Sequence, residues 1–562
     1  MKNILYFHAL LISLLFLITS CKKDIDFKNK IDSNMVAESL TTVTSLTSSK
    51  MYFVSPAGND NNNGLSSATP WQTISKVNSA TFAAGDLILF EGGQTFNGKL
   101  YIKNSGVSGN NIKFASYGSG KAIINGDSSS AIYAYNCSYI TIDSLVVTGN
   151  WNAASQSGNN SYGILFYNAL PGAVKLGEVT VAHCEVKGFY KSGISFLAWP
   201  SDLSQSGYSK ITVMGNTVHD NGAAGISTLG PSGTAGSTVY AFPYVYIAYN
   251  RVFNNMGVRS NISSHSGDGI IIGDASGGVV EHNVAYNNGW YNSAPSGGPA
   301  AIWCYDSKNI IFQYNEAHHN GTGAGTPDGD GFDLDGGVVN CTMQYNYSHD
   351  NYGAGFLLWE YGNLRAKNSN NILRYNISQN DNTNNNNTVY GGISMGPNCN
   401  NNLFYNNTIW SVKGSAVFVT GGSGNKFYNN IFESQGTAPG IVSTSGSFFL
   451  SNNYYNAAGF RVKYAGTTYT TLTAFRNTGN EKYNAISYGY SVNPQLSSPG
   501  TAGSINTGNP NAITNYIPTT GSPMINTAFN LTSLGLNVGT KDFRKSSIPY
   551  GGGYDIGACE RH

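Results

Sequence analysis

The stretch Asn309-Ile310-Ile311-Phe312-Gln313-Tyr314-Asn315 shows the pattern that decides the fold, because close copies of it recur along the chain. Each copy is a short run rich in β-forming residues that ends in an asparagine. After each asparagine come a polar turn and a second short strand that begins Gly-Ile or Gly-Phe. The asparagines, spaced 34 to 23 residues apart, are Asn216, Asn250, Asn283, Asn315, Asn346, Asn376, Asn406 and Asn429. Helical periodicity is absent, so helices are not the main element.

A repeat of this length with two or three short strands is typical of a solenoid. A leucine-rich repeat would need Leu-x-x-Leu-x-Leu, which is missing, and a propeller blade needs about 40 residues. We therefore predict an all-β chain that forms a right-handed, single-stranded parallel β-helix. Its coils would stack about 4.8 Å apart, with long loops on one side and the asparagines in a ladder that satisfies the turn backbone.

The amino-acid composition excludes several classes of protein. The chain has 562 residues, a net charge of +1 and only 11% charged residues, so it is not an electrostatic nucleic-acid binder. Its 12% aromatic content excludes a disordered chain. Six cysteines follow Cys21 without any Cys-x-x-Cys pair, so we expect buried packing residues rather than zinc ligands. We expect a monomer.

The N-terminal residues predict export and anchoring. A short apolar run at 9–18 leads into Ile18-Thr19-Ser20-Cys21, which resembles the bacterial lipobox, and Lys22-Lys23-Asp24 resembles the export tag of surface lipoproteins in Gram-negative bacteria. The predicted location is the outer membrane, exposed at the cell surface, with the lipid on Cys21 as the membrane contact. The predicted divisions are a signal peptide in 1–21, a polar tether in 22–50, the β-helix in 51–440, and terminal coils with a C-terminal cap in 441–562.

Aligning the second strand of every coil predicts one functional face. Side chains alternate along a strand, so the residues two and four places after its opening Gly or Ala point outward. In three consecutive coils, acids and aromatic residues gather at and just beyond these positions: Trp303, Tyr305, Asp306, Asp333, Asp335, Trp359 and Glu360. Aromatic faces can cover the apolar side of a pyranose, and carboxylates can hold hydroxyls or transfer protons. The face therefore predicts a sugar-binding cleft.

The aspartates of 327–337 admit two functional interpretations besides a structural turn. In the first, Asp333 and Asp335 are the catalytic carboxylates, with Cα atoms about 6.6 Å apart at 3.3 Å per residue; Glu360 and Asp306 are further catalytic candidates. Close carboxylates push one pKa up and so supply an acid and a base at one pH. In the second interpretation the residues bind Ca²⁺ through carboxylate oxygens. Its ligands would be Asp328, Asp330 and Asp333.

Histidines form a second polar column three residues after the asparagines, at His219, His318 and His349. His349 or His318 could shuttle protons or bind substrate near Asp333. The alternative is a set of turn residues stacked in the ladder. The substrate-binding candidates are Trp303, Tyr305, Trp359, His318, His265, Arg365 and Lys367.

Both ends of the predicted fold carry a family resemblance. The segments 51–60, 69–74 and 554–560 resemble the opening and closing segments of secreted right-handed β-helix proteins of the pectate-lyase-like superfamily. The resemblance implies a carbohydrate-active protein but not its reaction, because that superfamily holds lyases, hydrolases, epimerases and non-catalytic proteins. Asp330-Gly331-Phe332 also resembles a segment of family 9 polysaccharide lyases, in which a lysine base follows shortly. Here Asp333, Leu334 and Asp335 follow instead.

We therefore expect a surface-anchored, polysaccharide-degrading glycoside hydrolase that needs no cofactor. A Ca²⁺-assisted lyase acting by β-elimination on a uronic-acid polymer is the first alternative, and a non-catalytic glycan-binding or adhesive β-helix is the second. A β-helix lyase needs a Lys or Arg base and a cation. Between residues 261 and 364, Lys308 is the only Lys or Arg, which favours hydrolysis of a neutral glycan.

Overall fold

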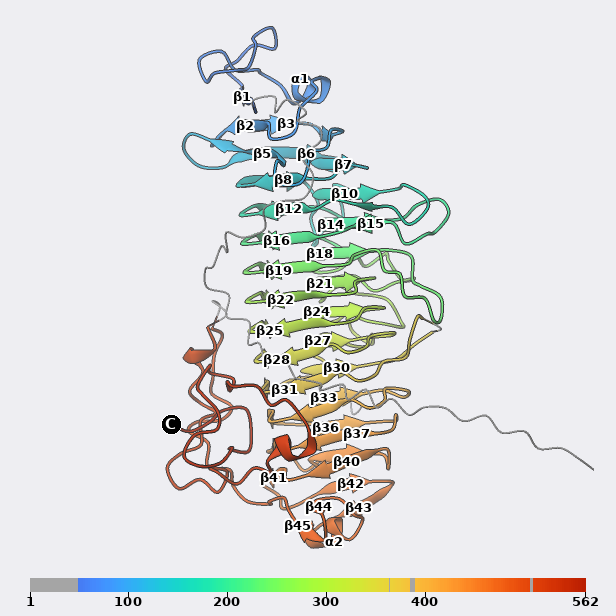
Figure 1. Ribbon diagram of the computed structural model, residues 1–562, viewed down its shortest axis with the longest axis vertical. Coiled ribbons are helices and arrows are strands. Elements are labelled where there is room, and N and C mark those ends of the chain that lie inside the picture. Colours follow the sequence, from blue (N-terminus) through green and yellow to red (C-terminus); the bar gives the residue numbers. More distant parts are fainter. Residues whose placement is uncertain (1–48, 363, 385–389, 506–508) are drawn as a thin grey trace, which may run out of the picture. The chain divides into compact units, whose positions relative to one another are not determined.

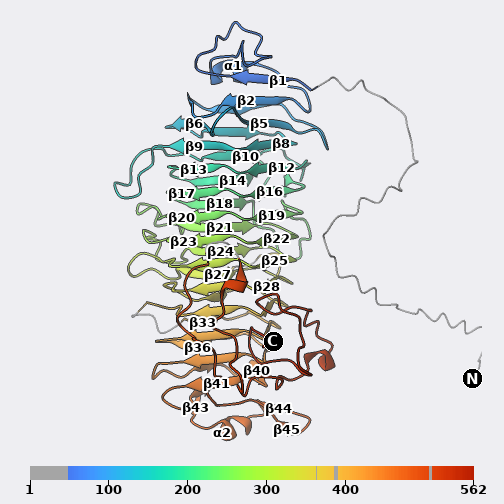
Figure 2. The ribbon, with the colours of Figure 1, turned by 90° about the vertical axis from the view of Figure 1, so that its left-hand side faces the viewer.

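The computed structural model describes residues 49–362, 364–384, 390–505 and 509–562. Three long sheets of parallel strands run through it (Figures 1 and 2). Each coil adds one strand to each sheet, so the predicted parallel β-helix is confirmed. Cys21 and the rest of 1–48 lie outside the described residues.

Sheet 1 holds the strand that precedes each asparagine turn. It consists of β1 (Met51–Val54), β2 (Leu87–Glu91), β5 (Ile112–Tyr117), β8 (Ile140–Asp143), β12 (Val179–Ala182), β16 (Ile211–Met214), β19 (Val245–Ala248), β22 (Gly278–Glu281), β25 (Ile310–Gln313), β28 (Thr342–Gln344), β31 (Ile372–Arg374), β34 (Leu403–Tyr405), β37 (Asn425–Tyr428) and β40 (Ser447–Leu450).

Sheet 3 follows the asparagine turn. It consists of β3 (Thr95–Asn97), β6 (Ala122–Asp127), β9 (Leu145–Gly149), β13 (Glu185–Lys187), β17 (Thr217–His219), β20 (Arg251–Phe253), β23 (Val284–Tyr286), β26 (Glu316–His318), β29 (Tyr347–His349), β32 (Ile377–Gln379), β35 (Thr408–Ser411), β38 (Ile431–Ser434) and β41 (Asn453–Asn456).

Sheet 2 closes each coil after a loop. It consists of β4 (Leu100–Ile102), β7 (Ile132–Tyr135), β10 (Ile164–Asn168), β14 (Ser192–Ala198), β18 (Ala224–Leu229), β21 (Asp268–Gly273), β24 (Ala300–Tyr305), β27 (Asp330–Leu334), β30 (Phe356–Leu358), β33 (Gly391–Met395), β36 (Ser415–Val419), β39 (Ile441–Ser443), β42 (Val462–Tyr464) and the antiparallel β43 (Thr467–Tyr469). The remaining elements are the strand pairs β11 (Lys175–Leu176) with β15 (Gly207–Tyr208) and β44 (Lys482–Tyr483) with β45 (Ile486–Ser487), the helices α1 (Ile74–Ser79) and α2 (Leu472–Arg476), and the 3₁₀ turns η1 (Pro510–Ala512) and η2 (Leu531–Leu534).

The register of sheet 2 agrees with the alignment made from the sequence. Trp303 pairs with Asp333, which pairs with Leu357 on the next coil. The alternate positions point inward and are buried; Phe332 and Phe356 stack there with ring centroids 5.1 Å apart. Because every coil buries the same alternate positions, a one-residue slip would expose the core, and this holds the register.

The asparagine ladder forms as predicted at first and then shifts by one residue. Each ladder Oδ1 accepts the backbone N–H and the Nδ2–H of the asparagine one coil earlier, at 2.9–3.1 Å. The prediction of Asn406 and Asn429 was wrong, because their successors Asn407 and Asn430 occupy the ladder. Asn406 and Asn429 have φ of 52° and 53°, the left-handed position that Tyr314 holds in an earlier coil. Two adjacent asparagines made the register ambiguous.

A second ladder, which the sequence analysis missed, follows the first by five residues. It consists of Asn221, Asn255, Asn288, Asn320 and Asn351 and ends on Asp381. The constant five-residue offset is visible in the sequence and could have revealed it. Together the two ladders hold both ends of every sheet 3 strand in these coils.

The C-terminal residues both cover the last coil and pack along the side of the β-helix. Coil strands continue to Tyr464, and α2 then buries Phe475 against Phe449. The chain after α2 forms a second core in which Tyr516 and Phe543 are buried with tyrosines of the coils. Figure 1 shows this segment in red beside the coils. The cap was expected, but packing along the side was not.

The cysteine expectation is confirmed for the described part of the chain. Cys137, Cys184, Cys304, Cys341, Cys399 and Cys559 are all buried and unpaired. Within that same part, none of the helices has the length and apolar character needed to cross a membrane.

Candidate active site

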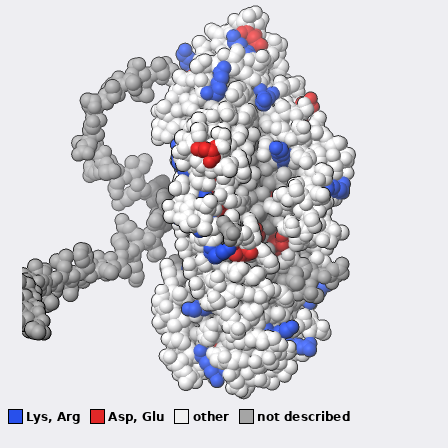
Figure 3. Space-filling view, turned by 90° about the vertical axis from the view of Figure 1, so that its right-hand side faces the viewer, with Lys and Arg blue, Asp and Glu red and all other residues white. Residues whose placement is uncertain are grey.

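A cleft of about 670 Å³ lies on the outer side of sheet 2, over β24, β27 and β30. Figure 3 shows a face on which most of the surface is uncharged and acidic side chains gather in a hollow. The cleft is lined by Ser263, Ser264, His265, Ser296, Gly297, Gly298, Trp303, Pro327, Asp328, Asp333, Asp335, Leu357, Trp359, Tyr361 and Tyr390. Loops that precede strands of sheet 2 form part of its walls, and the segment after β30 adds Trp359 and Tyr361.

Asp333 and Asp335 lie in this cleft because of the alternation along β27. Phe332 and Leu334 fill the core, so the aspartates beside them face out. Asp333 is only 7% exposed, and its Oδ1 has no hydrogen-bond partner among the described residues. Burial, together with the charge of Asp335, raises the pKa of Asp333 well above its usual range. One of the two carboxyls therefore stays protonated at neutral pH.

Asp335 differs from Asp333 in its surroundings. Burial and the charge of Asp328 raise the pKa of Asp335 to about 8, whereas the Gly336 N–H and His265 lower it. Because these two groups favour its charged form, Asp335 is the member of the pair that ionises first. Because the pKa of Asp335 is about 8, the pair offers one acid and one carboxylate as the pH rises toward that value.

A buried aspartate that the sequence analysis missed holds one wall of the cleft. Asp268, at the start of β21, accepts hydrogen bonds from Nε1 of Trp303 at 2.9 Å and from the backbone N–H of Ala300 at 3.2 Å. Its other oxygen lies 2.9 Å from Nδ1 of His265. Burial lowers the pKa of His265, but the charge and hydrogen bond of Asp268 outweigh it and raise that pKa to about 9. His265 is therefore a cation in the cleft at neutral pH.

Aromatic side chains complete the cleft. Trp359 and Tyr361 are 39% and 43% exposed, so their rings are available to a ligand. Tyr305 lies beside Trp303, with ring centroids 5.6 Å apart, and supports it from outside the lining. The sequence alignment found Trp303 and Trp359 but missed Tyr361 and Tyr390, which lie beyond the aligned strand positions.

The three aspartates predicted to bind Ca²⁺ lie near one another, but among the described residues they do not form one of the closely spaced groups of metal-ligating side chains. Asp330 and Asp333 both lie on β27, close enough that the charge of Asp330 contributes to the raised pKa of Asp333. Asp328 is held by the Tyr390 hydroxyl at 2.5 Å and the Gly298 N–H at 2.6 Å, and Asp330 accepts from the Ala354 N–H. Where the structure describes the chain, the groups of close metal-ligating side chains lie elsewhere.

Asp306 and Arg365 are not in the cleft, contrary to prediction. The Arg365 guanidinium lies 2.5 Å from Asp306 and 2.6 Å from Asp274, and it also packs over the Tyr240 ring at 4.2 Å. All three charged groups are buried. The alternation rule fails for Asp306 because it follows the end of β24, where the chain turns toward sheet 1. The cluster is a structural ion pair that ties loops to the coils.

Glu360 and Lys367, which were also predicted for the site, instead stabilise a turn outside the cleft. Glu360 is buried; its Oε2 accepts from the backbone N–H of Asn368 at 2.7 Å and of Gly337 at 3.2 Å. Lys367 lies 3.2 Å from its other oxygen. Neither side chain lines the cleft.

His318 and His349 belong to a different face from Asp333, so the prediction of a shared site was wrong. They lie on β26 and β29 of sheet 3, whereas Asp333 lies on sheet 2. Their rings stack 4.8 Å apart in a column continued by Tyr286. The stacking alternative therefore describes them. Counting from the asparagine turn gave the column but not the sheet to which it belongs.

The chain is similar to known carbohydrate-active and β-helix proteins. A family model described as right handed beta helix region matches residues 203–373, which include β27 and its neighbours. A lacto-N-biosidase from Bifidobacterium longum subsp. longum is 26% identical over an alignment of 616 residues, covering 92% of this chain and 37% of that protein. The chain thus spans little more than a third of that relative.

Two solved structures resemble the fold at low identity. One is a GH136 lacto-N-biosidase from Eubacterium ramulus, at 17% identity and a TM-score of 0.48, covering 79% of this chain and 67% of that one. The other is the pectate lyase Pel9A, at 15% identity and a TM-score of 0.45, covering 92% and 98%.

Proposed function

We propose that the chain is a glycoside hydrolase that cleaves a neutral glycan in the cleft, with Asp333 and Asp335 as its carboxylate pair. The observation that carries the proposal is this outward-facing pair of carboxyls. Burial raises the pKa of both, and exposed aromatic rings line the same cleft. The 26% identity to a lacto-N-biosidase over 92% of the chain supports a glycosidase.

The surroundings assign a role to each carboxyl. Asp333, the more buried, keeps its proton and would donate it to the leaving glycosidic oxygen. Asp335, which His265 and the Gly336 N–H favour as an anion, would act on the sugar or on water as nucleophile or base. Trp359 and Tyr361 would stack on the sugar rings.

The lining favours hydrolysis over β-elimination. An eliminating enzyme needs a base beside the uronate α-proton, and in this fold that base is usually Lys or Arg. None of the described residues that line the cleft is Lys or Arg. Arg365 and Lys367 are both bonded to acids outside it.

The test incubates the chain from Ser49 onward with neutral and uronic polysaccharides and with oligosaccharides. Each digest is read for new reducing ends and for the absorbance of an unsaturated uronide. Reducing ends without that absorbance would support hydrolysis, and the absorbance itself would establish a lyase. Reducing ends from no substrate would favour a glycan-binding protein.

We also propose that Cys21 is lipidated and anchors the chain, as a monomer, at the outer membrane surface. The support is the lipobox-like Ile18-Thr19-Ser20-Cys21 and the polar tether that follows it. This anchor would place the cleft where extracellular glycans can reach it.

A further inference from the structure

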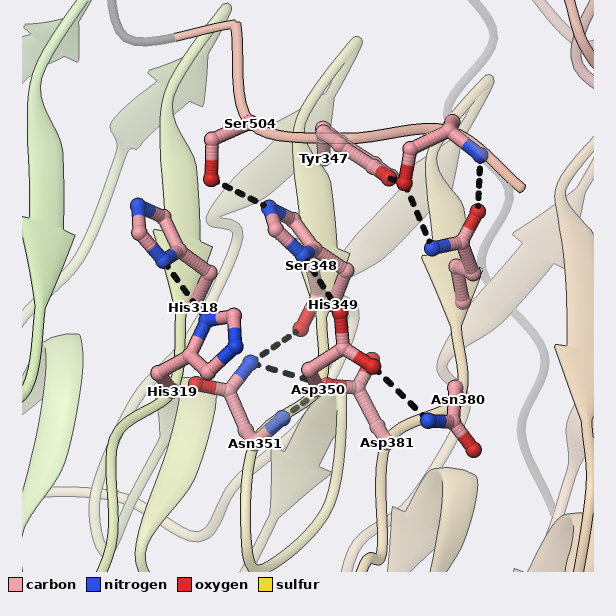
Figure 4. A network of polar contacts seen from close by, with 12 residues as sticks. His318, His319, Tyr347, Ser348, His349, Asp350, Asn351, Asn380, Asp381 and Ser504 are labelled. Atoms are coloured by element: carbon pink, nitrogen blue, oxygen red, sulfur yellow. Dashed lines mark hydrogen bonds and ion pairs between the residues drawn. The ribbon is translucent and has the colours of Figure 1, made fainter. Parts of the chain in front are cut away.

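A second polar cluster lies on sheet 3, under the C-terminal segment and apart from the cleft. Glu316 and His318 come from β26, and His349 comes from β29 on the next coil. All three side chains are buried, and one donor atom from each lies within 4.8 Å of the others. Figure 4 shows the two histidine rings side by side, with Ser504 of the C-terminal segment beside His349.

The hydrogen bonds turn the same nitrogen of both rings toward this point. Nδ1 of His349 lies 2.9 Å from Asp350, and Nδ1 of His318 lies 2.9 Å from Nδ1 of His319. Nε2 of His349 lies 3.2 Å from the Glu316 carboxylate. Nε2 of His318 is buried and has no hydrogen-bond partner among the described residues. A buried polar atom without a partner is unfavourable, and a bound ion would satisfy it.

We propose that Glu316, His318 and His349 bind a zinc-like divalent transition-metal ion. Two imidazoles and one carboxylate are a ligand set that zinc accepts, whereas Ca²⁺ and Mg²⁺ prefer oxygen ligands alone. Zinc–nitrogen bonds of about 2.0–2.1 Å in a tetrahedron bring ligand atoms to about 3.3 Å from one another. The donor atoms must therefore close from within 4.8 Å, which needs both rings to tilt out of their stack.

The residues behind the ligands suit this role. Asp350 accepts from the far side of His349 and is itself held by the Asn380 amide at 2.7 Å. A carboxylate behind a ligating histidine fixes the ring orientation and makes the other nitrogen a better ligand. Asp350 is therefore a positioning residue.

The site would clamp the C-terminal segment to the coils. The Ile505 N–H donates to Glu316 at 2.7 Å, and the Ser504 hydroxyl lies 3.3 Å from Nε2 of His349. On the coil after His349, Gln379 occupies the paired position of sheet 3. Its amide donates to the Ala502 carbonyl at 2.8 Å and accepts from the Ala502 N–H at 3.1 Å. An ion at the three ligands would organise the side chains on which this segment rests.

The test titrates zinc into the chelator-treated full chain by calorimetry. We expect one equivalent with a dissociation constant below about 1 µM, and binding weakened at least about 100-fold in His318→Gln and His349→Gln. Asp350→Asn should weaken it about 10–100-fold. The matched control is His219→Gln: His219 occupies the same column beside an aspartate, but Phe253 rather than a histidine stacks on it. This control should bind zinc as the wild type does.

Two outcomes would overturn the site: no stoichiometric zinc in the wild type, or equal loss in His219→Gln and His318→Gln. Circular dichroism checks that each variant is folded. Anomalous diffraction at the zinc edge, measured on crystals of the wild type, locates the ion without relying on any variant. Anomalous density elsewhere would also refute the assignment. None of these readouts depends on hydrolase activity.

Discussion

The Asp268→Asn substitution tests whether the charge of Asp268 keeps His265 protonated in the cleft. The amide keeps the shape of the carboxylate and an oxygen that can accept from Trp303, but it removes the charge beside His265. That charge holds the pKa of His265 at about 9 against an ordinary value of 6.5. At about 1.4 kcal/mol for each tenfold change in proton affinity, the raised pKa contributes roughly 3 kcal/mol to the free energy of unfolding.

The sign of the pH dependence follows from the raised pKa. A group whose pKa is higher in the folded state stabilises fully below its unfolded pKa, and this stabilisation is lost as pH rises through the folded value. The stability gap between wild type and Asp268→Asn should therefore be largest below pH 6.5 and shrink steadily up to about pH 9.

Urea denaturation of both proteins across this pH range measures the gap. In a His265→Gln background the same Asp268 substitution should give a gap without the decline between pH 6.5 and about 9, because His265 no longer titrates. A gap that is equally large below pH 6.5 and above pH 9 in the wild-type background would refute the reasoning.

Three further predictions concern other parts of the chain. Arg365→Met leaves the buried Asp274 and Asp306 without their cation and should lower the free energy of unfolding by about 3–5 kcal/mol in urea denaturation; a loss under about 1 kcal/mol would contradict the buried ion pair. Trp359→Ala removes a half-exposed cleft ring and should raise KM about tenfold with little change in kcat or melting temperature, whereas an unchanged KM would remove Trp359 from the binding surface. Cys21→Ser should move the chain from the membrane fraction to the soluble fraction and abolish labelling by a radioactive fatty acid, and a variant that still sediments with membranes would contradict the anchor.

The sequence predicted what the repeat itself controls. Strand alternation within one coil and equivalence between coils were enough to pair Trp303 with Asp333 and Leu357. The calcium hypothesis for Asp328, Asp330 and Asp333 stays a prediction.

Contacts outside the repeat could not be predicted in this way. Arg365 contacts Asp274, which lies 91 residues earlier in the sequence, because loops of different coils fold over one another. No local sequence pattern predicts that pairing. The histidine column was visible, but its place on sheet 3 depends on how many strands separate it from the cleft. The C-terminal segment that covers His349 lies more than 150 residues further along the chain, so its position follows from tertiary packing.

The most direct test of the central claim compares the rates of glycan cleavage by the wild type, Asp333→Asn, Asp335→Asn and the control Glu281→Gln. Glu281 is a carboxylate on sheet 1, away from the cleft. Losing a catalytic acid or base costs about 10²–10⁴-fold in rate. We predict losses of that size in both cleft variants, unchanged activity in Glu281→Gln, and no change in folding. Cleavage by Asp333→Asn and Asp335→Asn at the wild-type rate would contradict the carboxylate pair.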